Sequence, residues 1–412
     1  MKITLVPICR LLLVTLPLLT LAGCFSWGSR ATRLLPETTA LERSYKYDGK
    51  VVIVGAGAAG LAAARVLEEH RINYAVLEAT DCFGGRLQED RSFADFPIDL
   101  GAEWIHNNAS ILNVISGKEG AAESVNLLPY HLTEAATWDG ESLTAVPSSN
   151  LDAQFDYFPE FKFKDSTWYS FISEHYGKKV AHKIRYNSPV IEIDYSGETV
   201  RLRTLSGEVH EADRVIVATS IGILKAGKIT FTPKLSERKR AAIESVDFRP
   251  GIKLFLKFSE KFYPDAISCE VEKGEKTYYD VAFGKDSRSH VLGFLATGSA
   301  AKDFSSSTEE QVVESVLKEL DLMFEAKASD AFTGDYRLTN WGSKPYTVGT
   351  WVEGFNVKKS TLKELNRPLN HRVYFAGEAN DPYQQLGVPA AVLSGLHTVD
   401  RLLSDAAITR RR

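Results

Sequence analysis

The chain has 412 residues, more than one hydrophobic core usually serves, so we expect two domains or one interwoven pair. Its 44% hydrophobic and 25% charged residues are ordinary for a soluble globular enzyme. The formal net charge of −4 argues against nucleic acid as the main partner, because phosphate binding needs a basic surface.

The N-terminal segment 1–23 has the pattern of an export signal, with basic residues before a short apolar run that ends in small residues. Its end, Leu21-Ala22-Gly23-Cys24, resembles a bacterial lipobox, which implies cleavage before Cys24 and lipidation of the thiol. A plain signal peptide and an uncleaved anchor helix are the alternatives, although the apolar run is short for a bilayer span. Residues 24–46 are then a polar tether. The expected location is a bacterial cell envelope, on the periplasmic or exterior side.

The four cysteines do not indicate a disulfide scaffold. Cys9 leaves with the signal and Cys24 carries the lipid, so two thiols remain, Cys82 and Cys269. A disulfide between them is possible but does not follow from the sequence. The chain has no CxxC pair and no HExxH sequence, so we predict no metal site.

In chain order, segment 50–70 predicts a strand, a tight turn and a helix, and segment 73–80 predicts a second strand. Segment 188–220 predicts three strands separated by two Ser-Gly turns. Helices are predicted at 308–324 and 389–405. Elements of the nucleotide-binding type thus occupy the start, middle and end of the chain, which predicts a discontinuous architecture.

Gly55, Gly57 and Gly60 form a GxGxxG sequence directly after an apolar strand. The first glycine allows the tight turn, the second lets a pyrophosphate approach the backbone, and the third lets helix and strand pack closely. Glu78 ends the next strand, where its carboxylate can accept hydrogen bonds from a ribose diol. A glycine-rich packing turn does not explain Glu78, so we predict a dinucleotide site.

Two further glycine turns follow, Gly84-Gly85 and the stretch 98–106. The first lets a backbone run close to a second part of a long cofactor, and Arg86 can pair with a pyrophosphate. By position alone both turns could be ordinary loops.

The strand 248–258 poses a question about Lys253. Alternation places Lys253, Phe255 and Lys257 opposite an apolar face. One interpretation is a solvated lysine, and the other is a buried ammonium that faces a cofactor. The strand pattern leaves both open.

The sequence resembles the flavin amine oxidase family over most of residues 50–405. The resemblance rests on six segments in order, namely the GxGxxG with Glu78, 84–86, 100–106, 212–248, 340–351 and 374–395. It implies an α/β fold, with a discontinuous Rossmann-like FAD-binding domain interwoven with a smaller α+β substrate domain. The implied FAD-binding segments are 47–106, 186–223 and 360–405, and the implied substrate-domain segments are 107–185 and 224–359.

The resemblance also implies roles for single residues. Lys253 matches a lysine that reaches the flavin N5 through a water, which favours the buried interpretation. Trp341 matches a tryptophan beside the ring system, Trp351 matches one wall of an aromatic cage for the amine, and His106 lies where relatives carry a histidine or an acid. The alternative for each tryptophan is simple core packing. The alternative for His106 is an ordinary position in a loop.

The resemblance implies FAD, with Glu378 at the ribityl or ribose hydroxyls and the Val190 backbone at adenine. We predict non-covalent binding because the cysteine of covalent members is replaced by Thr350. Gly387 and Val388 place backbone N–H groups at the pyrimidine end of the flavin, at a helix start. The positions assigned to FAD are Gly55, Gly57, Ala59, Gly60, Glu78, Gly84, Gly85, Arg86, Gly101, Ala102, Glu103, Trp104, Val190, Gly377, Glu378, Gly387 and Val388.

The sequence departs from the family in several places. Thr350 stands where members with covalent flavin have a cysteine. Gly387 replaces the second cage wall, which leaves the cage half open unless Tyr383 fills it. Ala390 replaces a glycine, Thr80 and Cys82 replace basic residues, and the first insertion is short, which implies a shallower substrate funnel.

We therefore predict an FAD-dependent amine oxidase, which oxidises a primary or secondary amine to an imine that hydrolyses to an aldehyde. O2 is the expected acceptor and is reduced to H2O2. The alternatives are an FAD-binding envelope lipoprotein with little or no oxidase activity and an L-amino-acid oxidase. An amino-acid oxidase needs an arginine for the substrate carboxylate, and Arg249 is the nearest in sequence to Lys253.

Overall fold

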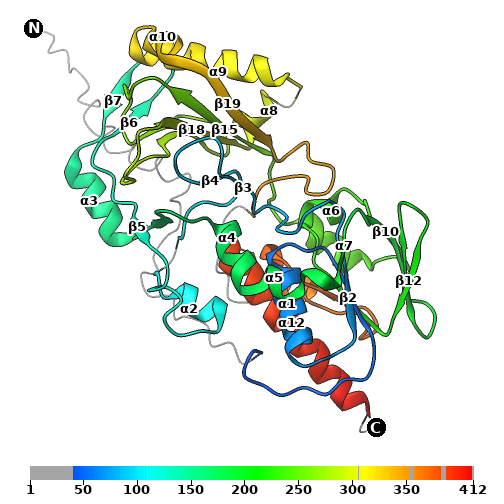
Figure 1. Cartoon of the computed structure of the whole chain (residues 1–412). Helices are drawn as coiled ribbons and strands as arrows, with labels where there is room; N and C mark the ends of the chain where they lie inside the picture. Colours follow the sequence, from blue (N-terminus) through cyan, green and yellow to red (C-terminus); the bar gives the residue numbers. More distant parts are fainter. Residues whose placement is uncertain (1–39, 107, 305, 353–356, 382–386, 411–412) are drawn as a thin grey trace, which may run out of the picture.

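The computed structural model describes residues 40–106, 108–304, 306–352, 357–381 and 387–410 (Figure 1). The predicted signal segment, Cys24, most of the predicted tether and Tyr383 lie outside the described residues. No helix in these ranges has the length and apolar character needed to cross a bilayer.

A five-stranded parallel sheet carries the first glycine turn. Its strand order is β20-β13-β1-β2-β9. The bounds are β1 (Val51–Val54), β2 (Tyr74–Leu77), β9 (Ile184–Arg185), β13 (Arg214–Val217) and β20 (Val373–Phe375). β1 reads Val-Val-Ile-Val and is buried at all four positions, as expected for a parallel strand that is covered on both faces.

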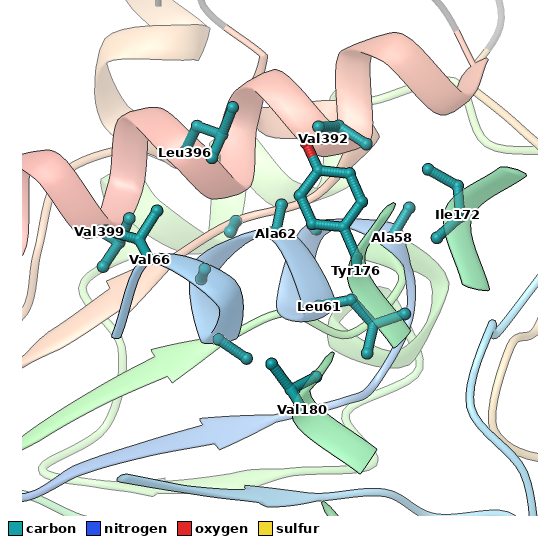
Figure 2. Packing of buried hydrophobic residues seen from close by; sticks show 14 of the residues in the cluster. Ala58, Leu61, Ala62, Val66, Ile172, Tyr176, Val180, Val392, Leu396 and Val399 are labelled. Atoms are coloured by element: carbon teal, nitrogen blue, oxygen red, sulfur yellow. The ribbon is translucent and has the colours of Figure 1, made fainter. Parts of the chain in front are cut away.

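Two helices from opposite ends of the described chain cover one face of this sheet, α1 (Ala58–Glu69) and α12 (Gly387–Arg410). In Figure 2, Ala62 and Val66 of α1 lie beside Leu396 and Val399 of α12. The helices can approach closely because Gly395 has no side chain. A Cβ at this position would lie 2.2 Å from the Ala59 carbonyl oxygen. This contact brings the C-terminal part of the chain onto the predicted nucleotide-binding element.

A helical segment that we assigned to the substrate domain joins the same core. It comprises α4 (Trp168–Ile172), a π-helical turn (Ser173–Gly177) and α5 (Lys178–Val180). Tyr176 and Val180 are fully buried against α1 (Figure 2), and β9, which follows, pairs with β2.

The other face of the parallel sheet packs on a four-stranded sheet of order β12-β11-β10-β14. The bounds are β10 (Val190–Asp194), β11 (Val200–Thr204), β12 (Val209–Ala212) and β14 (Thr230–Thr232). The prediction of three strands over 188–220 is wrong at its end. The third splits at Asp213, whose carboxylate accepts from the Lys50 N–H at 2.7 Å, and the chain passes there from one sheet to the other.

A seven-stranded sheet forms the second part of the molecule, at the top of Figure 1, with order β19-β15-β18-β17-β16-β6-β7. The bounds are β6 (Ala135–Trp138), β7 (Leu143–Ala145), β15 (Gly251–Phe258), β16 (Ala266–Cys269), β17 (Lys276–Asp280), β18 (His290–Thr297) and β19 (Phe332–Asn340). The predicted helix at 308–324 is confirmed as α9 (Glu309–Phe324), which starts with a capping box between Thr308 and Gln311.

The two faces of β15 have different partners. Ile252, Leu254 and Leu256 pack under α9, in the core of the seven-stranded sheet. Phe255 faces the opposite way, toward β4 (Ile98–Asp99), which pairs with β3 (Glu89–Asp90). The alternation predicted for this strand is confirmed, and both of its faces are covered by protein.

Shorter elements connect these layers. They are α2 (Ile111–Ser116), β5 (Leu127–Pro129), α3 (Ser148–Tyr157), β8 (Phe161–Phe163), α6 (Ile221–Lys225), α7 (Glu237–Glu244), α8 (Ser299–Lys302), α10 (Lys327–Ala331), α11 (Lys359–Leu365) and 3-10 turns at Ala181–Lys183 and Glu378–Asn380.

Residues 40–46 differ from the expectation of a polar tether, because they contact the folded body. Ala40 is 3% exposed in the core around α1 and α12. The Tyr45 hydroxyl donates to Asp400 of α12 at 2.6 Å, and Arg43 forms an ion pair with the same carboxylate at 2.9 Å. A tether would therefore end before residue 40. Cys82 and Cys269 are both free, the first exposed and the second buried, so they form no disulfide with each other.

Candidate active site

A cavity of about 710 Å³ lies where the parallel sheet meets the seven-stranded sheet. Val54 and Leu77, at the carboxyl ends of β1 and β2, line one part, and Lys253 and Leu295 of β15 and β18 line another. The carboxyl ends of parallel strands are where α/β proteins bind nucleotides. The size lies within the range of ligand cavities.

The structure brings together nearly all of the predicted site residues around this cavity. Those that line it are Gly55, Gly57, Ala59, Glu78, Gly84, Gly85, Arg86, Gly101, Ala102, Glu103, Trp104, His106, Val190, Lys253, Trp341, Trp351, Gly377, Glu378, Gly387 and Val388. Gly60 is absent from the lining and lies behind the turn, where a Cβ would lie 2.0 Å from the Gly55 carbonyl oxygen.

The glycine turns have the geometry that close backbone approach requires. Gly55 has φ +104° and Gly84 has φ +113°, a region that side chains rarely adopt. A Cβ at Gly57 would meet nothing within 4 Å, which leaves its backbone open to the cavity. The Gly84 N–H donates to the Ala56 carbonyl at 2.9 Å, so the two turns are held side by side.

The Glu78 carboxylate holds the backbone of the first glycine turn. One carboxylate oxygen accepts from the Ala56 N–H at 2.7 Å, and the other accepts from the N–H and hydroxyl of Thr80 at 2.9 and 2.8 Å. The side chain is buried and lines the cavity. Among the described residues, Oε2 accepts only from the Ala56 N–H, so its second lone pair keeps acceptor capacity for a ligand hydroxyl.

Arg86 and Glu378, which we predicted to contact different parts of the cofactor, form an ion pair of 2.7 Å with each other. Arg86 also donates to the Thr350 carbonyl, and Glu378 accepts from the Val352 N–H at 3.2 Å. The pair therefore joins the second glycine turn, the 350–352 segment and the 3-10 turn after β20.

Lys253 is the least exposed charged residue that lines the cavity, with 3% of its surface exposed, so the solvated interpretation is wrong. Its ammonium donates to the carbonyls of Asp99 and Gly101, each at 3.0 Å, and to Glu103 Oε2 at 2.7 Å. Burial lowers the pKa of Lys253, and the adjacent Glu103 carboxylate opposes that shift.

Aromatic side chains enclose the same region. Trp341 is 3% exposed, and its indole N–H donates to the Leu100 carbonyl at 3.1 Å, so it combines core packing with a place in the cavity wall. Trp351 and Trp104 are partly exposed and line the cavity. Rings of this kind exclude water and attract a cationic or neutral amine through their faces.

His106 lines the cavity with 29% of its side chain exposed and contacts Glu160 through Nδ1 at 2.5 Å. Burial alone would lower the pKa of His106, but the Glu160 carboxylate outweighs burial and raises the pKa above its ordinary value. Sequence reasoning missed Glu160, whose place beside His106 depends on the pairing of Ile105 with Phe161.

Lys162 and Tyr279 were also missed, although both contact Glu103. Lys162 Nζ lies 2.5 Å from Glu103 Oε1, and the Tyr279 hydroxyl donates to Oε2 at 2.7 Å. A weak sequence signal exists for Lys162, which stands between Phe161 and Phe163 in a strand, the same alternation that marks Lys253.

The residues present fit FAD. The open backbone at Gly57 matches a pyrophosphate, and the N-terminus of the long helix α12 faces the cavity at Gly387 and Val388. The Thr219 hydroxyl lines the same cavity, is buried, and has no hydrogen-bond partner within the described part of the chain. An unpaired buried hydroxyl at this position indicates that a ligand group completes the site.

Comparisons with known proteins agree with this geometry. The chain matches the family model described as flavin containing amine oxidoreductase over residues 58–175 and 169–403. Polyamine oxidase 1 of Zea mays is 26% identical over 458 residues, covering 87% of this chain and 91% of that protein. Lysine-specific histone demethylase 1B of Mus musculus is 25% identical over 442 residues, covering 86% of this chain and 53% of the demethylase, so the chain spans about half of that relative.

Two solved structures share the fold. A double mutant of putrescine oxidase, redesigned in cofactor binding, superposes with a TM-score of 0.68 at 16% identity, covering 87% of this chain and 99% of that chain. Cyclohexylamine oxidase from Brevibacterium oxydans superposes with a TM-score of 0.69 at 16% identity, covering 88% and 100%. The chain belongs to the family of flavin-containing amine oxidoreductases, whose members use FAD and act on amines.

Proposed function

We propose that the protein is an amine oxidase that converts a primary or secondary amine into an imine, with O2 reduced to H2O2. The imine then hydrolyses to an aldehyde or ketone. The observation that carries the proposal is that the glycine turns, Lys253 and Glu103 line one cavity. A cofactor held by the turns would thus lie in the same space as an amine held by the aromatic rings.

A bound FAD would supply the two-electron acceptor for oxidation of the C–N bond. Gly57, Arg86 and Glu378 would hold its phosphate and sugar parts, and the N-terminus of α12 would favour negative charge near Gly387 and Val388. Thr350 has no thiol that could bond to a flavin, and its hydroxyl already donates to the Arg249 carbonyl at 3.0 Å. Both features support non-covalent binding.

The amine part of the cavity would bind a neutral amine, whose lone pair assists the oxidation. Trp104, Trp341 and Trp351 restrict water there, which strengthens the field of the Lys253 ammonium. A fixed positive charge in a dry site stabilises the negative charge that develops when O2 accepts electrons.

An L-amino-acid substrate has less support. Arg249, the arginine considered for a substrate carboxylate, pairs with Asp247 at 2.5 Å and is not among the residues that line the cavity. Arg86 lines the cavity, but Glu378 and the Thr350 carbonyl occupy its guanidinium. We therefore propose an amine that lacks an α-carboxylate.

The test is anaerobic mixing of the FAD-loaded protein with a panel of monoamines, diamines and polyamines while the flavin absorbance is followed. We expect at least one amine to bleach the flavin, and oxygen to restore the absorbance with release of H2O2. Lys253→Met is the matched control, because it removes the charge and keeps an unbranched side chain that is only one atom shorter. If no amine bleaches the flavin, the alternative of an FAD-binding lipoprotein without oxidase activity replaces this proposal.

We further propose that the protein is exported and anchored to the envelope by lipid on Cys24. The proposal rests on the Leu21-Ala22-Gly23-Cys24 sequence alone. Metabolic labelling with a fatty acid in a bacterial host tests it, with Cys24→Ala as the control. Labelled wild-type protein beside an unlabelled variant supports the anchor, and equal labelling of both contradicts it.

A further inference from the structure

The Glu103 carboxylate bridges two buried lysines, a feature that the role of Lys253 alone does not require. Oε1 lies 2.5 Å from Lys162 Nζ, and Oε2 lies 2.7 Å from Lys253 Nζ. The three side chains are 3 to 5% exposed and come from β8, β15 and the segment after β4. The Tyr279 hydroxyl donates to Oε2 and is the third partner that fixes the carboxylate.

The contacts of Lys253 match a protonated amine. An ammonium has three N–H donors and no acceptor. Lys253 Nζ is bonded to three oxygens, the carbonyls of Asp99 and Gly101 and Glu103 Oε2. A neutral amine would turn its lone pair toward one of these oxygens, which is repulsive. All three donors thus contact protein oxygens, so the water-mediated contact with the flavin N5 that the resemblance implies would have to share one of them.

The surroundings of Lys162 suit a cation, and Glu103 is an anion. Lys162 Nζ lies 4.9 to 5.0 Å from the ring centroids of Trp104, Tyr130 and Tyr279, a cage that suits a cation. Burial would raise the pKa of Glu103, but the two lysines outweigh burial and hold that pKa at about 2. Glu103 is therefore an anion throughout the neutral range.

We propose that Glu103, fixed by Lys162 and Tyr279, is a positioning residue that keeps Lys253 a protonated ammonium with its donors occupied. In this arrangement Lys253 acts toward the bound flavin as a fixed positive charge and does not transfer a proton. The part that concerns the flavin rests on the proposed function. The protonation of Lys253 by itself does not.

The two charged neighbours of Lys253 shift its pKa in opposite directions. Glu103 stabilises the ammonium, whereas the like charge of Lys162 disfavours it. Removal of Glu103 therefore lowers the pH at which Lys253 loses its proton, and removal of Lys162 raises it. Two variants with opposite expected signs separate this role from a general loss of structure.

Other titratable groups surround Glu103, Lys253 and Lys162. Burial raises the pKa values of Asp99, Tyr130 and Tyr279 well above their ordinary ranges, with help from the Glu103 charge, so the two tyrosines remain neutral. Burial lowers the pKa of Lys285 to about 8, and its ammonium donates to the carbonyls of Phe163 and Lys164. A probe of Lys253 must therefore be resolved from Lys285.

Lysine-selective 15N NMR of the Nζ signals provides such a probe, in the FAD-loaded protein and in protein stripped of FAD. The Lys253 signal is assigned by its loss in Lys253→Met, and that of Lys285 by its loss in Lys285→Met. We expect the titration midpoint of Lys253 to increase in the order Glu103→Gln, wild type, Lys162→Met, with steps of about one pH unit or more. FAD affinity and thermal unfolding of each variant report on folding.

An equal midpoint in the three proteins, a reversed order, or a neutral Lys253 at pH 7 in the wild type overturns the inference. If Glu103→Gln fails to fold, the Lys162→Met variant decides alone, since a midpoint equal to or below that of the wild type contradicts the proposal.

A second experiment tests the effect on the flavin. It follows reoxidation of the FAD-loaded protein by O2 after chemical reduction with dithionite. We expect its rate to fall as pH rises, with midpoints in the same order as in NMR, and identical pH profiles overturn the charge role. Because dithionite replaces the amine, both experiments remain decisive even if no amine is oxidised.

Discussion

The two ends of the cavity are built in different ways. At the glycine turns, backbone groups of two short segments, 55–60 and 84–86, form the wall, and few side chains are needed. Around Lys253, side chains from the segment after β4, β8, β15, β17 and the 341–352 segment meet, and no two of these segments are neighbours in the chain.

This difference separates what a substitution should do at each end. At the glycine turns, an added atom either collides with backbone or enters the ligand space, so the effects concern folding and cofactor binding. At the Lys253 end, the loss of the lysine or of a partly exposed ring leaves the cofactor part intact, so these effects concern amine and oxygen chemistry.

A large loss of stability is expected at Gly60. Gly60→Ala places a Cβ 2.0 Å from the Gly55 carbonyl oxygen and should destabilise the protein by about 3 kcal/mol. Gly57→Ala is the matched control, because its Cβ meets nothing within 4 Å and its φ is −74°. We expect Gly57→Ala to fold with a normal melting temperature but to bind FAD at least about tenfold more weakly. Calorimetry and FAD titration measure both, and equal behaviour of the two variants would contradict the division of roles.

Lys253→Met tests the other end. It removes the buried charge, so the reaction of the reduced protein with O2 should slow by about 100-fold. The FAD dissociation constant should stay within a factor of about three, because the phosphate-binding turns are unchanged. Stopped-flow reoxidation and equilibrium titration check the two parts. Loss of FAD binding without a change in the oxygen rate would reverse the assignment.

Substitutions of Trp341 and Trp351 should have different effects on stability and on amine binding. Trp341 is 3% exposed and bonded to Leu100, so Trp341→Ala should lower the free energy of unfolding by about 3 to 5 kcal/mol. Trp351 is partly exposed, so Trp351→Ala should change stability little and raise KM for the amine by about tenfold. Denaturant unfolding and steady-state kinetics measure these effects. A larger stability loss for Trp351→Ala would contradict the comparison.

The smallest effect concerns His106 and Glu160. Because the pKa of His106 is raised, the pair is neutral overall below that pKa and carries one negative charge above it. KM for a cationic diamine should fall by about threefold as pH rises through this pKa, and His106→Gln should remove that change. A wild-type KM profile identical to that of His106→Gln excludes the role.

The glycine end was predictable from sequence because its requirements are local. A turn with positive φ needs glycine, and a strand, a turn, a helix and an acid at fixed spacing place Gly55, Gly57 and Glu78 together. The pairing of Arg86 with Glu378 was not predictable, because each residue was assigned to the cofactor and their contact depends on the packing of β20 beside β13.

The Lys253 end was predictable only in part. Alternation on β15 placed Lys253 opposite the core, but its burial depends on β4 covering that face. Lys162 and Tyr279 reach Glu103 from strands of two different sheets, which no local pattern encodes. The break of the third predicted strand at Asp213 has a similar origin, since a change of sheet leaves the apolar alternation intact.

The most direct test of the account is a crystal structure of the FAD-loaded protein. We predict that the phosphates lie against Gly57 and that the flavin ring lies beside Lys253, with the Lys253–Glu103–Lys162 contacts preserved. A flavin ring outside the cavity between the two sheets, or a Lys253 side chain turned away from it, would contradict the account.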